Sequence, residues 1–172
     1  EISVRDWSSD VCSSDLQAGA GFAFDTGSHL FHAMLYLSGL RATEICAVTD
    51  NQGAAVEIMA AALVRFDNGA MGTVLCNGNS PKFEEGIHVA GTRGAVRTSV
   101  YGNRLEHWDD RGQLVRYPAV KPVPSMYQNF VDCILGRAES VCPAVWGLRQ
   151  ALLMEALYES ARTGKPVKVR PE

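Results

Sequence analysis

One stretch near the start of the chain constrains the fold more than any other. Small residues occupy positions 18–21, and apolar residues then recur at three- and four-residue intervals from Leu30 to Leu37. This spacing predicts a helix from Asp25 onward, with Gly39 where a helix C-terminus is expected. Small residues ahead of a helix let the backbone pass close to another body, such as a ligand or a second domain.

Three polar side chains are expected on one face of this helix. Asp25 and His29 lie four residues apart, and His32 lies three further on, so the three follow one another on consecutive turns. A carboxylate one turn from an imidazole can orient it, and an imidazole can take or give a proton near neutral pH. Asp25 and His29 are therefore candidate acid–base residues. The alternative is that Asp25 caps the helix and His29 is an ordinary core or surface histidine.

The glycine, aspartate and histidine spacing of this stretch is itself a signature. Gly-x-Gly-x3-Asp-x-Gly-x-His begins at Gly19 and opens an apolar helix that ends in Leu-x-Gly. It resembles the C-terminal domain of the glucose–fructose and inositol dehydrogenase family, Gfo/Idh/MocA. The chain departs from the family twice, because Ala20 stands within a run of three glycines and His32 stands where aspartate is common.

Short strands and tight turns are expected in the middle of the chain. Residues 56–66 fit either a helix or a strand, but the turn signal at 67–69 favours a β-hairpin with the apolar run that follows. Thr92 and Arg93, flanked by glycines, predict a second hairpin rather than a phosphate loop, since no helix start follows. His88 and His107 fall in alternating patterns and are expected to be solvated strand residues. Strand patterns cover residues 42–49, 70–77, 85–91, 94–101, 104–109 and 113–117.

Two helices are expected over residues 127–136 and 146–164, after a loop marked by Pro118, Pro122 and Pro124, and residues 165–169 are expected to end the chain as an extended piece. A Phe-x3-Ile-x-Gly helix followed by Ala-x-Tyr-x-Ser-Ala-x-x-Gly-Lys-Pro-Val also resembles the family's ending. Together these elements predict an α+β fold over residues 17–172, a largely antiparallel sheet with helices packed on one face.

The N-terminal segment, residues 1–16, is expected to lie outside this fold and to be disordered. Residues 5–16 have no helical or strand period and resemble the translation of a common sequencing-adapter oligonucleotide fused in frame. The alternative is a genuine linker rich in serine and aspartate.

In the family, a Rossmann domain with a Gly-x-Gly-x-x-Gly turn and a Glu-Lys-Pro lysine comes first, and neither motif occurs in this sequence. The N-terminal Rossmann domain is therefore expected to be absent.

Composition excludes several classes of protein. The 172 residues carry a net charge of −3, which suits one domain and does not point to a nucleic acid or membrane partner. No apolar run is long enough to span a bilayer. The cysteines show no metal-ligand or disulfide spacing, so Cys46, Cys76 and Cys133 are expected to be small core residues in a reducing, cytoplasmic compartment.

The resemblance implies the substrate-binding half of an NAD(P)-dependent oxidoreductase that acts on a secondary alcohol of a sugar or cyclitol. It implies His29 as the general acid or base, Asp25 as the residue that orients it or binds substrate hydroxyls, and His32 as a further substrate-binding residue. NAD or NADP would serve the full-length enzyme, whereas this chain is expected to bind no cofactor and to be inactive alone. A homo-oligomer would form through the open face of the sheet.

Two other classes of function stay open. One is a non-catalytic oligomerisation module. The other is a metal site on Asp25, His29 and His32, which are plausible ligand types on one helix face. No further ligand pair is evident in the sequence, so no metal is expected.

Overall fold

The computed structural model describes residues 21–82, 84–100, 104–116 and 125–172. The expectations for residues 1–16 and for the proline-marked loop at 118–124 lie outside these residues. The described residues divide into two compact units, one formed by residues 21–82 and 145–172 and the other by those within 84–144. Each unit is considered by itself.

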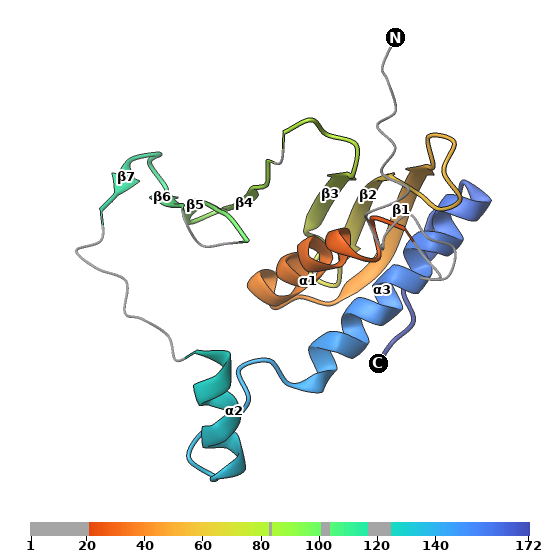
Figure 1. The fold of residues 1–172 in the computed structure, drawn as a ribbon. Coiled ribbons are helices and arrows are strands. Elements are labelled where there is room, and N and C mark those ends of the chain that lie inside the picture. The colour runs from red at the N-terminus through yellow and green to blue at the C-terminus, as the bar shows by residue number, and fades with distance from the viewer. Residues whose placement is uncertain (1–20, 83, 101–103, 117–124) are drawn as a thin grey trace. The chain divides into compact units, whose positions relative to one another are not determined.

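The first unit is built on a four-stranded antiparallel sheet in the order β3-β2-β1-β8. Figure 1 shows β1, β2 and β3 side by side. Its strands are β1 (Ala42–Asp50), β2 (Met59–Phe66), β3 (Met71–Asn77) and β8 (Val167–Lys168). Pairing with both β1 and β3 makes the ambiguous apolar run a strand. The predicted β2–β3 hairpin is confirmed, and Gly69 in its turn has φ of 86°, a conformation that favours glycine.

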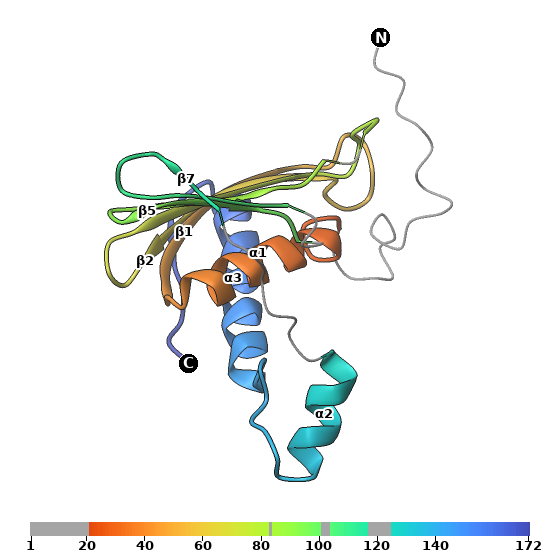
Figure 2. The ribbon, with the colours of Figure 1, turned by 90° about the vertical axis from the view of Figure 1, so that its left-hand side faces the viewer.

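Two helices, α1 (Thr26–Ser38) and α3 (Ala144–Thr163), pack on one face of this sheet (Figure 2). Strand alternation turns Ile45 and Val64 inward, and both are fully buried. Phe31 and Leu35 from α1 meet Leu153 and Leu157 from α3 in the same core. The expected α+β fold with an antiparallel sheet and helices on one face is therefore confirmed for this unit.

The buried hydroxyl of Ser160 joins the end of α3 to the sheet. Its Oγ accepts a hydrogen bond from the backbone N–H of Ala47 (2.9 Å) and donates to the carbonyl of Lys165 (2.7 Å). The serine of the C-terminal motif thus satisfies two backbone groups, one in β1 and one in the turn that leads to β8.

The second unit contains a smaller antiparallel sheet in the order β4-β5-β6-β7 and one helix. The predicted hairpin at Thr92 and Arg93 is confirmed, and a Cβ at Gly94 would lie 2.1 Å from the carbonyl oxygen of Trp108 on the next strand. The helix begins after Ser125, whose hydroxyl accepts from the N–H of Gln128 (3.2 Å). The elements are β4 (Ile87–Gly91), β5 (Gly94–Thr98), β6 (Leu105–Trp108), β7 (Leu114–Val115) and α2 (Met126–Ile134).

The expectation that three cysteines are core residues is only partly correct. Cys76 is buried, but Cys133 is half-buried and Cys46 is exposed. Cys46 lies between Ile45 and Ala47, which both point inward, so strand alternation turns its side chain to the opposite face. An apolar neighbourhood in the sequence did not reveal this, because in a strand the nearest neighbours lie on the other face.

Substitution of Ser160 by alanine should lower the free energy of unfolding by about 1–3 kcal/mol, because the buried N–H of Ala47 loses its acceptor. Urea denaturation followed by circular dichroism measures this. Thr163→Ala, which removes an exposed hydroxyl bonded to the carbonyl of Glu159 on the same helix, is the matched control and should change stability by less than about 0.5 kcal/mol. Equal effects of the two substitutions would contradict the role given to Ser160.

Candidate active site

Helix α1 has two distinct faces. Gly27, Phe31 and Leu35 follow one another at four-residue intervals and are buried against the sheet. Asp25 and His29 are exposed, and His32 is half-buried. The structure therefore places all three predicted site residues away from the core side of α1, with Asp25 at the helix start.

Asp25 occupies the N-cap position, but its side chain makes no capping hydrogen bond. The hydroxyl of Ser28 instead donates to the backbone carbonyl of Asp25 (2.6 Å). Among the described residues, no hydrogen bond joins the carboxylate of Asp25 to the imidazole of His29. The Asp25 carboxylate is thus not used to satisfy the helix backbone, which is the purpose that the capping alternative assigned to it.

The loop that leads into α1 is held by one residue, Glu57. Three consecutive backbone N–H groups donate to it: Gly21 to Oε2 (3.0 Å), Phe22 to the main-chain carbonyl (2.9 Å) and Ala23 to Oε1 (3.1 Å). The phenolic hydroxyl of Tyr158 on α3 also donates to Oε1 (2.8 Å). We refer to these five residues together as the Glu57 clamp.

Both side chains in the hydrogen bond between Tyr158 and Glu57 are shielded from water. Glu57 is 9% exposed and Tyr158 is half-buried. Burial, and then the hydrogen bond to Glu57, holds the pKa of Tyr158 well above its ordinary value. The Tyr158 hydroxyl therefore remains a hydrogen-bond donor to the carboxylate throughout the physiological pH range.

Of the small residues before α1, the structure describes Gly21, which packs closely against Glu57. A Cβ at Gly21 would lie 2.0 Å from the carbonyl oxygen of Glu57 and 2.6 Å from its Oε2. The group that passes close to the backbone at Gly21 is therefore Glu57 of the same chain. The amides of Gly21, Phe22 and Ala23 are already bonded to Glu57, so this loop does not form a phosphate-binding turn.

His32 connects α1 to α3. Its Nδ1 lies 3.1 Å from Oε1 of Gln150, and its ring stacks on Tyr36 with centroids 5.9 Å apart. Tyr36 in turn meets Trp146 edge to face at 5.4 Å. His32 is therefore held by side chains of both helices, whereas His29 is exposed at the surface of α1.

Two further structural findings bear on the alternatives. Across the described residues, no three His, Cys, Asp or Glu side chains are grouped so that they could hold a metal ion, so Asp25, His29 and His32 do not form a ligand set. None of the helices in the described part of the chain is long and apolar enough to cross a membrane.

Three residues near the site escaped the sequence analysis: Glu57, Tyr158 and Gln150. Tyr158 did carry a signal, because it belongs to the C-terminal motif, but the motif does not name its partner. Glu57 is the one acidic residue within the apolar run of residues 56–64, which is the pattern of a buried charge with a specific partner. Gln150 had no signal of its own.

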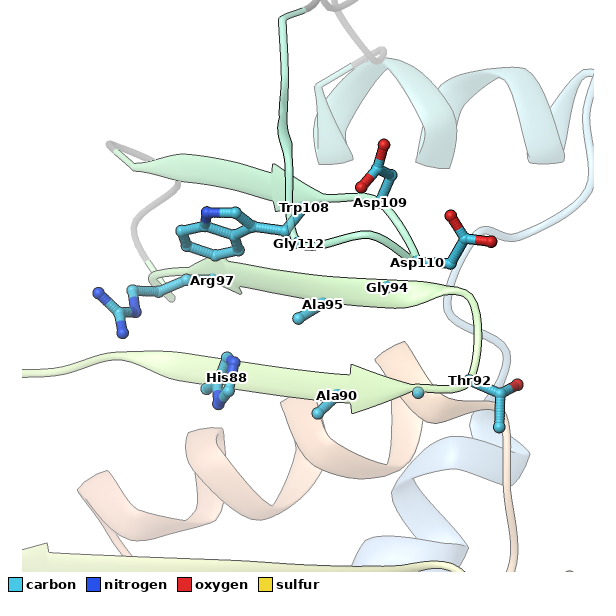
Figure 3. A pocket seen from close by; sticks show the side chains of 11 residues that line it. His88, Ala90, Thr92, Gly94, Ala95, Arg97, Trp108, Asp109, Asp110 and Gly112 are labelled. Atoms are coloured by element: carbon cyan, nitrogen blue, oxygen red, sulfur yellow. The ribbon is translucent and has the colours of Figure 1, made fainter.

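A concavity of about 430 Å³ lies in the second unit over β4, β5 and β6 (Figure 3). His88 lies beside Arg97 in it, and the Arg97 guanidinium is 5.7 Å from the centre of the Trp108 ring. Arg97 also pairs with Glu106 at 3.8 Å. His88 is exposed, as expected of a solvated strand residue, whereas His107 is half-buried.

Comparison with known proteins agrees with this architecture. The sequence model of the GFO/IDH/MocA C-terminal domain matches residues 3–97. No curated protein matches the chain. Given this family match and the antiparallel α+β fold, the chain belongs to the GFO/IDH/MocA family and carries its C-terminal domain.

Solved structures with a similar fold are about twice as long as this chain. An NAD-binding protein from Listeria innocua is 20% identical with a TM-score of 0.74, over 92% of this chain and 54% of its own. An aldose-aldose oxidoreductase from Caulobacter crescentus, complexed with glycerol, is 25% identical with a TM-score of 0.74, over 87% and 48%. The WlbA dehydrogenase from Bordetella pertussis, in complex with NADH and UDP-GlcNAcA, is 27% identical with a TM-score of 0.71, over 89% and 46%.

Cys76, which packs beneath the start of α1, should be resistant to alkylation in the folded chain. Burial raises the pKa of its thiol from 9.0 to about 11, so the reactive thiolate is scarce at mildly alkaline pH. Because the folded state holds this proton more tightly than the unfolded state, its contribution to stability is present below pH 9 and is lost as the pH rises toward 11.

Timed alkylation followed by peptide mass spectrometry measures the difference. The exposed Cys142 is the internal control and should react fast in the native chain, and both cysteines should react alike in urea. Equal rates for Cys76 and Cys142 in the native chain would contradict the burial of Cys76.

Proposed function

We propose that this chain is the substrate-binding and catalytic half of an NAD(P)-dependent oxidoreductase that acts on a secondary alcohol of a sugar or cyclitol. In this proposal His29 is the general acid or base. Asp25 orients His29 or binds substrate hydroxyls, and His32 contributes a further substrate contact. An NAD(P)-dependent reaction and a chain with thiol cysteines suit a reducing, cytoplasmic location.

One observation carries the proposal. The Glu57 clamp holds the loop that starts α1, and Asp25 and His29 lie exposed at that start, on the side away from the core. An exposed carboxylate and imidazole on an otherwise anchored element are suited to binding and proton transfer, because the scaffold holds them in place before substrate arrives.

The chemistry divides between this chain and the cofactor. Oxidation of a secondary alcohol releases a hydroxyl proton together with a hydride, and His29 would take the proton. A bound nicotinamide would supply the acceptor for the hydride. The described loop before α1 does not fit a dinucleotide, because its amides already bond Glu57, so the proposal assigns cofactor binding to a separate nucleotide-binding half.

Two relatives support the choice of substrate class. The aldose-aldose oxidoreductase is complexed with glycerol, and the WlbA dehydrogenase is in complex with NADH and UDP-GlcNAcA. Glycerol and UDP-GlcNAcA are both rich in hydroxyl groups. Hydroxyls exchange hydrogen bonds with exposed Asp and His side chains such as those at the start of α1.

The test is to join the chain to the nucleotide-binding half of a relative and to measure alcohol-dependent formation of NAD(P)H with a panel of sugars and cyclitols. In the active fusion, His29→Ala should lower kcat by roughly a hundred- to ten-thousand-fold, the range of general acid–base catalysis. Its fold should be unchanged by circular dichroism, because His29 is exposed.

His88→Ala, at an exposed histidine of β4, is the matched control and should retain full kcat. A folded His29→Ala fusion with near wild-type kcat would show that His29 is not the acid or base.

A specific observation also favours self-association. The sheet face opposite α1 and α3, here called the outer face, carries Cys46, Val48, Ala61, Leu63, Thr73 and Leu75. Val48 is 65%, Leu63 45% and Leu75 68% exposed, and such a run of exposed apolar side chains marks an interaction surface. We propose that a second copy of the chain covers this face, either as part of the enzyme or as the chain's own oligomerisation function.

Introducing Leu63→Lys and Leu75→Lys together should shift the chain to a monomer, because two charges would be buried between the paired faces. Light scattering after size exclusion measures the mass. Leu37→Lys, at an exposed leucine of α1, is the control and should leave the oligomer intact. A wild-type chain that is monomeric at high micromolar concentration would rule out this surface as a self-interface.

A further inference from the structure

Glu57 is an uncommon kind of residue, a buried carboxylate that forms no ion pair with any residue that the structure describes. Within the described part of the chain, its side chain accepts hydrogen bonds from neutral donors, the amides of Gly21 and Ala23 and the hydroxyl of Tyr158. No lysine or arginine among the described residues forms an ion pair with it. Removing a carboxylate from water is costly, and charge-assisted hydrogen bonds offset that cost only when their geometry is good.

Stability alone does not explain a charge at this position. Replacing a buried charged group by apolar residues of similar volume is often neutral or stabilising. A carboxylate does set the positions of its hydrogen-bond donors, since its two oxygens accept from donors at fixed angles. Here those donors belong to two separate parts of the chain, the loop before α1 and the C-terminal half of α3.

Direct participation of Glu57 in a reaction is excluded by its contacts. Both oxygens are engaged by donors, and the side chain is buried behind the loop that it holds. A general base must reach the proton that it takes, within hydrogen-bond distance of the substrate. Glu57 therefore acts on the site only through the backbone that it holds.

The backbone transmits the position of the clamp directly to Asp25. The carbonyl of Gly21 accepts from the N–H of Phe24 (3.1 Å) and of Asp25 (3.1 Å). The carbonyl of Phe22 accepts from the N–H of Gly27 in the first turn of α1 (2.8 Å). Gly21 and Phe22 thus donate their amides to Glu57 and accept hydrogen bonds from the start of α1 through their carbonyls. They connect Glu57 directly to the helix.

We propose that Glu57 is a positioning residue for the candidate active site, which fixes the start of α1 and with it the placement of Asp25 and His29. Tyr158 shares this role because it holds Oε1 from the side of α3. The inference rests on the proposed function only in treating Asp25 and His29 as the reacting groups, and the anchoring itself is a property of the chain alone.

Amide hydrogen exchange in the native chain tests the anchoring. In Tyr158→Phe, which removes one hydroxyl and keeps the ring, amides in residues 22–29 should exchange about tenfold to a hundredfold faster, the range for losing a hydrogen bond to a charged group. Glu57→Gln should give a larger increase, because a carboxamide presents an N–H group to one of the donors. Amides of β1 and β2 should exchange at wild-type rates in Tyr158→Phe.

Two control variants separate this effect from general changes. Tyr127→Phe removes an exposed phenol on α2, and Glu155→Gln neutralises an exposed carboxylate on α3, so neither should alter exchange in residues 22–29. If Tyr158→Phe leaves residues 22–29 unchanged, or accelerates β1 and β2 by the same factor, the proposal is wrong. Should Glu57→Gln fail to fold, Tyr158→Phe still decides the question.

A spectroscopic readout connects the anchor to the reacting group. The imidazole nitrogen resonances of His29 should shift or broaden in Tyr158→Phe, whereas those of His88 should not move, and an unperturbed His29 would overturn the positioning role. Both measurements need no substrate or cofactor. An inactive fusion enzyme would therefore overturn the proposed function without affecting the exchange result, and unchanged exchange would overturn the anchor without affecting the fusion.

Discussion

The bonds between Glu57 and the loop before α1 are the constraint on which the rest of the site depends. Three consecutive amides, from Gly21 to Ala23, find their acceptors in this single residue, and Tyr158 holds the same carboxylate from α3. Because these bonds tie the start of α1 to the rest of the unit, we infer that they position the exposed side chains at that start.

The residues of the C-terminal motif have mainly structural roles. Ser160 ties α3 to β1 and to the turn before β8, and Tyr158 ties the same helix to Glu57. Leu157, the residue before Tyr158, is fully buried in the core. A single turn of α3 therefore holds both the sheet and the loop of the candidate site, so the motif and the site form one packed structure although they lie far apart in the sequence.

Periodicity predicted the elements better than it predicted side-chain environments. The helix at Asp25, the hairpins at Gly69 and at Thr92, and the closing helices are all found, because each has a local cause in spacing or in turn chemistry. Cys46 was placed wrongly because a strand separates adjacent residues onto opposite faces. The close approach that the small residues before α1 predicted is found at Gly21, where the neighbour is Glu57, 36 residues away in the same chain.

The sequence by itself determined the family, the antiparallel α+β class and a helix on which Asp25, His29 and His32 share a side. These follow from local spacing, which a chain carries before it folds. Only the tertiary structure decided that Glu57 and Tyr158 anchor that helix and that His32 contacts Gln150. Such pairings join residues about a hundred positions apart, and they depend on how helices pack on the sheet rather than on any repeating pattern along the chain.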